Sequence, residues 1–399
     1  MLPRGTAAAA LDSVATLAGR PRPAPACVRP DLDGGGPGIA LVYHQLDQSL
    51  PGQGWDALAH GYLAASAAGA QRLAIRSPGL FGGLAGLAFT AWTLTSDPGM
   101  LPAVHDTLVR EATARARTLG DYPHGTPVRT FDVVSGLAGV GAYLLCRHHE
   151  QQTRHALRAV LSALVALCRE DTGTPHWHTP ASQIRDAPTR QEFPHGMLNC
   201  GLAHGISGPL ALLSLALSTG IVVPGHKDAV TRTARWLAAQ HVNDAHGPTW
   251  AGKIAPAGRP APSKLSTTSS SWCYGTPGIA RSLWLAAAAL DDPALRDLAL
   301  QAIRAVHRRT ATRVDAHDAP GLCHGLSGLL HITSRFAHDT KDLELTRAAT
   351  ELTERLLAPN TVTAADGPGY LDGAAGVALA LLAAATDCPP AWDRTLLLA

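Results

Sequence analysis

Residues 205–213 read GISGPLALL, a Gly-x-x-Gly pair followed directly by an apolar run. The same pattern occurs seven times in the chain, at intervals of 48, 53, 69, 70, 50 and 48 residues, and its first glycines are Gly35, Gly83, Gly136, Gly205, Gly275, Gly325 and Gly373. A single Gly-x-x-Gly pair carries no information. Seven of them in register indicate a repeat architecture.

Between the glycine motifs lie more charged segments with helical periodicity, at 106–119, 151–170, 227–242, 292–309 and 341–358. Each repeat therefore pairs an apolar helix with a polar-faced one. The apolar helix cannot face water, so we expect it in an inner layer that the second helix covers. A closed ring satisfies every repeat. The sequence predicts an all-α fold, an α/α toroid (barrel) of seven inner and seven outer helices, with a glycine opening each inner helix where backbones approach closely.

Two repeats are longer than the others and carry extra irregular material. Residues 176–196 and 243–271 are rich in Pro, Gly, Ser and Thr, which predicts loops or short hairpins that shape a site at one rim. We expect residues 1–25 to form an outer helix or a tail, and residues 26–399 to form a single toroid domain.

Composition narrows the class of protein. Apolar residues make up 46% of the chain and charged residues 16%, as in a globular protein with a large core. With 33 basic and 31 acidic residues the formal net charge is only +2, which gives no basic excess of the kind that binds nucleic acid. The N-terminus lacks an uninterrupted apolar segment typical of a signal peptide, and we expect a cytoplasmic location. An odd set of scattered cysteines fits a reducing compartment, at positions 27, 146, 168, 200, 273, 323 and 388.

Residues at one offset from the first glycine should occupy equivalent places in the ring. Two positions before it, Cys273 and Cys323 fall in the same column of adjacent repeats, and His324 follows the second of them. Two thiolates and an imidazole favour zinc, and three protein ligands leave the fourth position open, as in catalytic sites. The alternative is that these cysteines are small buried apolar residues and His324 a core histidine. Cys200 lies outside the column, as a structural residue or a neighbour of the site.

His204 stands at the same rim, one repeat before the Cys273 repeat, and is a candidate acid or base because imidazole titrates near neutral pH. Asp132 precedes the third glycine motif and is either a partner of such a histidine, an acid or base itself, or a helix N-cap. Tyr274 is a candidate hydrogen-bond donor to developing negative charge, with packing as the alternative. Asn199 and His195 lie in the approach to His204 as candidate supporting residues.

Three motifs resemble those of the LanC-type lanthionine synthetases: GLAHGISG at 201–208, WCYGTPGIARSL at 272–283 and CHGLSGLL at 323–330. The likeness includes all seven repeats, from about residue 30 onward, and the α/α toroid is the fold of that family. In one place the chain departs from the pattern. The family often has an arginine four residues before the cysteine of WCYG, where this chain has Ser269, while Lys264 and Arg281 are cations at other positions.

The resemblance implies a zinc-dependent lanthionine cyclase that adds cysteine thiols of a peptide to dehydroalanine or dehydrobutyrine, forming thioether rings. It implies that Cys273, Cys323 and His324 bind Zn2+, that His204 is catalytic, and that Asp132 and Tyr274 support it. Because the repeats occupy almost the whole chain, we expect a stand-alone cyclase. Its expected partners are a dehydrated lanthipeptide precursor, a separate dehydratase and an exporter, in a complex peripheral to the cytoplasmic membrane.

Two other functions remain open from the sequence. One is a LanC-like zinc protein that holds a thiol such as glutathione, or a cysteine peptide, without closing rings; Ser269 favours it and the presence of His204 and Asp132 opposes it. The other is a toroid of different chemistry, a glycosidase or a terpene or prenyl cyclase. Such enzymes need paired carboxylates or Asp-rich metal motifs, and Asp33, Asp132 and Asp372 are not paired in the sequence.

Overall fold

The computed structural model describes residues 2–18, 25, 28–122, 124–171, 173–260, 270–311, 319–359, 361, 365 and 367–399. The chain divides into two compact units, Met1–His105 with Thr312–Thr395, and Asp106–Ala311 with Leu396–Ala399. Helices dominate both units, and the strands are two or three residues long. Among the helices of the described ranges, none combines the length and the hydropathy that a membrane crossing requires.

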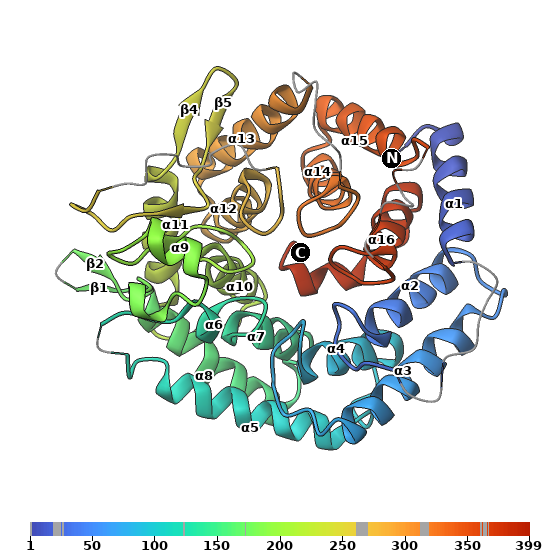
Figure 1. The fold of residues 1–399 in the computed structure, drawn as a ribbon, viewed down its shortest axis with the longest axis horizontal. Coiled ribbons are helices and arrows are strands. Elements are labelled where there is room, and N and C mark those ends of the chain that lie inside the picture. Colours follow the sequence, from blue (N-terminus) through green and yellow to red (C-terminus); the bar gives the residue numbers. More distant parts are fainter. Residues whose placement is uncertain are drawn as a thin grey trace. The chain divides into compact units, whose positions relative to one another are not determined.

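The first unit consists of apolar helices, each entered through a glycine turn, and of helices that cover them (Figure 1). The packed pairs are α2 (Gly36–Ser49) with α3 (Trp55–Arg72), α14 (Leu326–Thr340) with α15 (Leu343–Leu356), and α16 (Ala374–Ala385) with α1 (Arg4–Ala18). A further apolar helix, α4 (Leu84–Thr95), packs on α2. Because α16 contacts both α14 and α2, the last repeat packs beside the first. In the N-terminal segment, Arg4–Ala18 thus form an outer helix that covers α16.

The second unit repeats the same arrangement. Its packed pairs are α7 (Leu137–Cys146) with α8 (Gln151–Leu167), α10 (Ser207–Ser218) with α11 (His226–Ala239), and α12 (Thr276–Leu290) with α13 (Pro293–Ala311), and α5 (Pro102–Thr118) leads into the unit. Every residue of α7 from Leu137 to Leu144 is buried, whereas α8 alternates buried and exposed positions. The predicted pairing of an apolar with an amphipathic helix is therefore confirmed.

Glycine stands at the start of the apolar helices because the preceding turn leaves no space for a side chain. Six of the seven first glycines are N-caps, with φ between −145° and −90°, a range open to any residue: Gly35, Gly83, Gly136, Gly275, Gly325 and Gly373. A Cβ on Gly325 would overlap the carbonyl oxygen of Ala319 in the preceding turn. In the fourth repeat the helix begins one residue later than predicted, at Ser207, and Ile206 belongs to the turn, in which Gly208 N donates to Gly205 O at 3.3 Å.

Backbone hydrogen bonds join the turns that precede neighbouring helices of one unit. In each bond the accepting residue lies two positions before the first glycine of its repeat. The bonds run, from N to O, from Val133 to Ala203 (3.0 Å), from Ala203 to Cys273 (3.2 Å), from Cys323 to Leu371 (2.9 Å) and from Tyr370 to Asp33 (2.5 Å). The register inferred from the glycines is confirmed, because in both units the carbonyl group of this column accepts a backbone hydrogen bond from the turn of a neighbouring repeat.

The second insertion contains a short hairpin, as predicted, although its residues 261–269 lie outside the described ranges. The first insertion has a 3₁₀ turn at Ala181–Gln183 and the helix α9 (Ala187–Glu192), and the hairpin β1 (Glu170–Asp171)–β2 (Thr174–Pro175) directly precedes it. The second has the hairpin β4 (Val242–Asp244)–β5 (Gly247–Thr249). The second insertion meets the segment that follows the first where β6 (Lys253–Ile254) pairs antiparallel with β3 (Leu198–Asn199), directly before the glycine turn of the fourth repeat.

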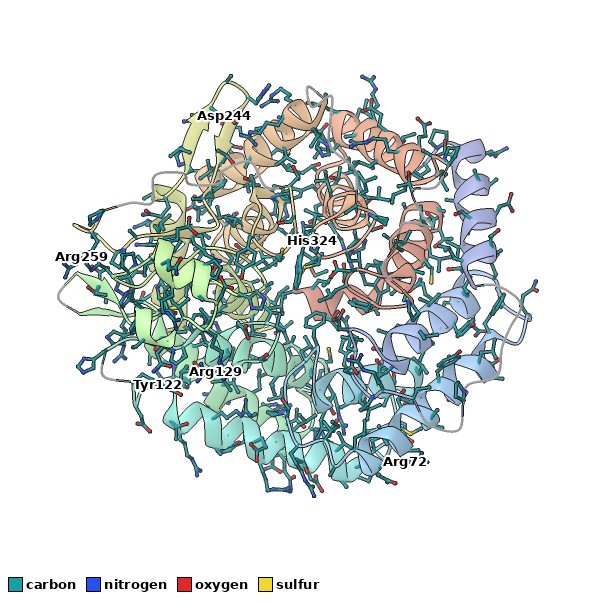
Figure 2. All side chains as sticks on the ribbon, in the orientation of Figure 1. Arg72, Tyr122, Arg129, Asp244, Arg259 and His324 are labelled. Carbon is teal, nitrogen blue, oxygen red and sulfur yellow. The ribbon has the colours of Figure 1, made fainter. Side chains whose placement is uncertain are left out.

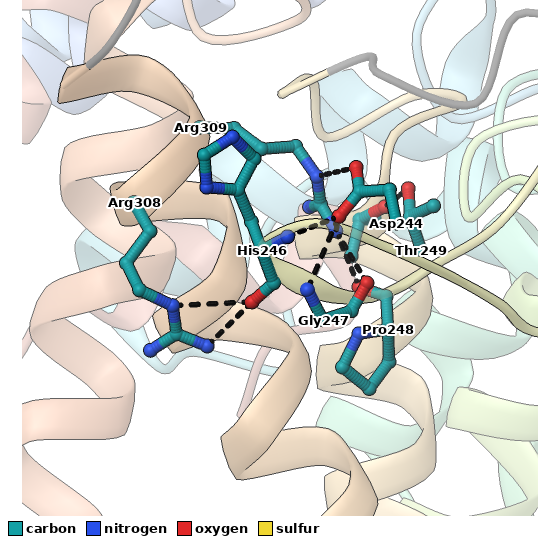
Figure 3. A network of polar contacts seen from close by, with 8 residues as sticks. Asp244, His246, Gly247, Pro248, Thr249, Arg308 and Arg309 are labelled. Atoms are coloured by element: carbon teal, nitrogen blue, oxygen red, sulfur yellow. Dashed lines mark hydrogen bonds and ion pairs between the residues drawn. The ribbon is translucent and has the colours of Figure 1, made fainter.

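An ion pair attaches the β4–β5 hairpin to α13 (Figure 3). Arg309 Nε donates to Asp244 Oδ2 at 2.5 Å, and its Nη2 donates to the carbonyl oxygens of Gly247 (2.8 Å) and Pro248 (2.9 Å). The hydrogen bond from Arg309 lowers the pKa of Asp244 to about 2. Arg308 also donates, to the carbonyl of His246 at 2.7 Å. Two arginine side chains of α13 therefore hold the start of the second insertion in place.

Candidate active site

Asp132 follows the short helix α6 (Val128–Phe131) and fixes the turn that opens α7. Its Oδ1 accepts hydrogen bonds from the backbone N–H groups of Ser135 and Gly136, both at 2.8 Å. Its Oδ2 lies 2.7 Å from Nδ1 of His204. The side chain of Asp132 is 2% exposed. Asp132 is therefore the partner of His204 and also fixes the turn before α7, whose N-cap is Gly136 rather than Asp132.

His204 lies in the turn directly before Gly205, one repeat after Asp132. The carboxylate of Asp132 faces Nδ1, and this contact favours the tautomer with its proton on Nδ1. Nε2 is then the nitrogen that can exchange a proton with a bound molecule. The side chain is one-third exposed, against the buried carboxylate behind it. A partly exposed imidazole that is held by a buried carboxylate has the geometry of a general acid or base.

Tyr274 packs against His204 in the same unit. The two rings are 5.6 Å apart between centroids, with 28° between their planes. The backbone allows this approach at Gly201, where a Cβ would overlap the Cys273 carbonyl oxygen and lie 3.0 Å from the Tyr274 ring. The structure therefore brings Asp132, His204 and Tyr274 together, from turns of three successive repeats.

Sequence reasoning missed one residue beside this cluster. Lys253 Nζ lies 5.0 Å from the centroid of the Tyr274 ring, and the residue belongs to β6 of the second insertion. No periodicity marks this insertion, so the repeat register gives Lys253 no column. The only sequence signal is a lysine after a glycine in a segment expected to shape the site.

The predicted metal ligands fall in both compact units. In the second unit Cys273 precedes α12, is 8% exposed, and has its Sγ 3.6 Å from Oγ of Ser271. In the first unit Cys323 and His324 precede α14, and Figure 2 labels His324 there. His324 Nδ1 is 3.4 Å from Oδ1 of Asp372, with both side chains about half exposed. Each cysteine occupies the same position of its turn.

The other predicted neighbours serve the fold. Burial raises the pKa of the Cys200 thiol to about 12, so it stays protonated at neutral pH and is a structural residue. Arg281 is buried and donates from Nε to the Leu398 carbonyl at 2.8 Å, which holds the C-terminal segment after the 3₁₀ helix Ala391–Leu396. The Asn199 side chain accepts a hydrogen bond at Oδ1 from Gly201 N (3.0 Å) within its own turn. His195 is exposed. Cys27, Lys264 and Ser269 lie outside the described residues.

Comparison with known proteins agrees with this fold and these motifs. The nisin biosynthesis protein NisC of Lactococcus lactis subsp. lactis is 24% identical over 359 residues, which are 88% of this chain and 84% of that protein. The solved structure of a nisin cyclase superposes with a TM-score of 0.81 at 21% identity, covering 99% of this chain and 98% of the other. That likeness confirms the predicted fold class, the α/α toroid.

A family model described as lanthionine synthetase C-like protein matches residues 27–397. The match includes all seven glycine repeats and every residue of the Asp132, His204 and Tyr274 cluster. The chain belongs to the lanthionine synthetase C-like family.

Proposed function

We propose that this protein is a zinc-dependent lanthionine cyclase, which adds cysteine thiols of a peptide to its dehydroalanine or dehydrobutyrine residues. The observation that carries the proposal is the half-open imidazole of His204, held on Asp132 and stacked on Tyr274. The similarity to a nisin biosynthesis protein and to a nisin cyclase supports the same reaction class.

We further propose that Cys273, Cys323 and His324 together bind Zn2+. Two thiolates and one imidazole are a donor set that zinc prefers, and it leaves one coordination position for a substrate. The Asp372 carboxylate on the Nδ1 side of His324 leaves Nε2 as the ligand atom, an arrangement typical of histidines that bind zinc. Zinc bound there would keep the thiol of a coordinated substrate cysteine deprotonated at neutral pH.

The reaction breaks the S–H bond of the cysteine and the π bond of the alkene, and it forms one C–S bond and one C–H bond. The thiol proton leaves to solvent, the sulfur adds to the β-carbon, the π electrons move onto the adjacent carbonyl as an enolate, and the α-carbon then takes a proton. His204, protonated on both nitrogens for this step, supplies that proton from Nε2, because Nδ1 faces Asp132. Asp132 accepts three contacts and is almost fully buried, so it orients and charge-balances His204 rather than meeting substrate. The Tyr274 hydroxyl is the candidate donor to the enolate oxygen.

The substitution Asp132→Asn tests the orienting role. Asparagine keeps an oxygen for the two backbone N–H groups but presents an NH₂ group to Nδ1, which reverses the tautomer of His204. We expect ring formation to slow by ~10²-fold, at the low end of acid–base effects, with an unchanged melting temperature.

The matched variant Asp132→Ala also loses the turn, and its free energy of unfolding should fall by about 1–2 kcal/mol. Ring-closure rates and urea unfolding curves of both variants give the two quantities. An Asp132→Asn protein that cyclises within about threefold of wild type would contradict the orienting role.

Asp372→Asn tests the support of His324. Losing the carboxylate should weaken zinc binding by up to about tenfold, the low end for such partners because this pair is half exposed. Competition with a chromophoric chelator measures the affinity. Asp31→Asn is the control, since its carboxylate pairs with Arg29 instead. Equal affinities of Asp372→Asn and wild type would assign no role to this contact.

We also propose that residues 26–399 form one toroid domain and that the protein acts in the cytoplasm. Its substrate would be a precursor peptide that a separate dehydratase has already dehydrated, and an exporter in a complex at the membrane surface would remove the product. The dehydratase follows from the reaction, because dehydrated residues must be present before rings can close.

Ring formation is tested with a dehydrated, cysteine-containing precursor peptide and the zinc-loaded protein. Addition of a thiol to an alkene does not change the mass, so closure is read as loss of sites that a thiol alkylating reagent can modify. The proposed cyclase protects one thiol per ring, and the protection survives denaturation. A LanC-like protein that only holds thiols on zinc would protect them in the complex and release them, fully reactive, on denaturation.

A further inference from the structure

Lys253 is the charged residue outside the predicted columns that contacts the His204 cluster. Its strand β6 is fixed next to the turn that carries His204, because Lys253 pairs with Asn199 of β3 and Gly252 O accepts from Cys200 N at 2.8 Å. Gly252 lets Tyr274 approach closely, since a Cβ there would lie 3.0 Å from the Cβ of Tyr274. The backbone therefore holds Lys253 beside the ring of Tyr274.

The ammonium group of Lys253 lies near Tyr274 and Thr189, and its charge also acts on the carboxyl group of Asp186, whose pKa is lowered first by hydrogen bonds from Thr189 and further by Lys253. Nζ lies 5.0 Å from the Tyr274 ring centroid, within the range of a cation–π interaction. It also donates to Oγ1 of Thr189 in α9 at 3.2 Å. The side chain is half-buried, an unusual state for a lysine, whose ammonium is strongly hydrated. A structural tether between the insertions would need only the contact with Thr189.

A continuous series of contacts thus runs from Asp132 through His204 and Tyr274 to Lys253, all within the second unit. At one end a buried carboxylate holds the imidazole. At the other a cation lies over the ring that the imidazole stacks on. The stacked arrangement of His204 and Tyr274 depends on how firmly each ring is held.

We propose that Lys253 is a positioning residue of the active site, whose ammonium holds the Tyr274 ring in its stacked place on His204. The proposal rests on the proposed cyclase function for its kinetic consequence, but not for its structural one. Lys253→Met removes the charge and keeps a chain of similar length. Lys253→Arg keeps a cation that can lie over the ring.

The structural consequence is measured on the zinc-loaded protein without substrate. With histidine rings labelled by ¹³C, the His204 signal is the one missing from a His204→Asn spectrum, and the face of Tyr274 shifts it upfield. Lys253→Met should move this signal downfield, toward that of an unstacked imidazole, and Lys253→Arg should leave it in place. Thr189→Val, which loses only the contact with α9, is the matched control and should also leave it in place.

The kinetic consequence is measured on ring closure. Lys253→Met should lower kcat by about tenfold with KM within about twofold, and Lys253→Arg should restore most of the loss. An unmoved His204 signal in Lys253→Met, or equal effects of Lys253→Met and Thr189→Val, would overturn the proposal in favour of a tether. If the His204 signal shifts in Lys253→Met but the wild-type protein closes no rings, the positioning role would be supported and the proposed function refuted.

Discussion

Replacing Cys273 or Cys323 by alanine is expected to reduce bound zinc from about one ion per chain to almost none. Each substitution removes one of three protein ligands, and the two remaining donors of the set cannot compete with solvent and buffer for the metal. Ring closure should then be lost as well, because nothing holds the substrate thiol deprotonated at neutral pH. Metal analysis of the purified proteins, with alkylation of the peptide product, measures both losses.

Cys200→Ala is the matched control for these variants. Cys200 lies at the same end of the apolar helices but outside the column of Cys273, and burial raises the pKa of its thiol to about 12. This variant should keep its zinc and its activity, with a modest loss of stability from the cavity. The ligand assignment would be wrong if Cys273→Ala retained zinc in full, or if Cys200→Ala lost it.

The second large effect is expected for His204→Asn, which should slow ring closure by about 10³-fold or more. Asparagine can still donate to the Asp132 carboxylate from its amide, but it cannot exchange a proton near neutral pH. Zinc content and melting temperature should be those of the wild type, because His204 is a third exposed and is not one of the proposed ligands. Rates from quenched time courses give the comparison.

The control for this variant is His60→Asn, an exposed histidine of α3 in the other unit, which should cyclise at the wild-type rate. A slow, non-stereoselective closure remaining in His204→Asn would be consistent with protonation of the enolate by water. A His204→Asn protein that retains the wild-type rate would place the proton donor elsewhere.

The repeated glycines account for how much of this architecture could be predicted. A column two positions before each first glycine predicts which residues are equivalent, and the backbone bonds Ala203 to Cys273 and Cys323 to Leu371 follow it. Packing of apolar with amphipathic helices follows from the same pattern, because each repeat must bury one face. The start of α10 at Ser207 could not be predicted from the glycine pattern, because Ile206 belongs to the turn, in which Gly208 N donates to Gly205 O.

The site was predictable only where it follows the repeat. His204 and Tyr274 stand in one column, and their stacking follows from neighbouring turns. The sequence alone could not assign the role of Asp132. The structure shows that Oδ1 accepts from the backbone of the turn, whereas Oδ2 faces Nδ1 of His204. Lys253 was missed because its position depends on the pairing of the second insertion with Asn199, and no periodicity links these two segments.

Arg281 illustrates the opposite error that sequence reasoning invites. It follows Cys273 closely along the chain and carries a charge that an enolate could use. Its guanidinium instead donates to the carbonyl of Leu398, and the side chain is buried among residues of the helix body. A charged residue close to a site along the chain is therefore available to substrate only if it is not already bound to backbone or side-chain groups elsewhere in the fold.

The central claim is that this chain catalyses addition of a peptide thiol across a dehydrated residue, and closure in D₂O tests it most directly. The α-carbon of such a residue has no hydrogen before the reaction and receives one from solvent during it. After return to H₂O, the cyclase account predicts a mass increase of about one unit per ring closed, absent with His204→Asn over the same time. A peptide whose thiols remain alkylatable and whose mass is unchanged would contradict it.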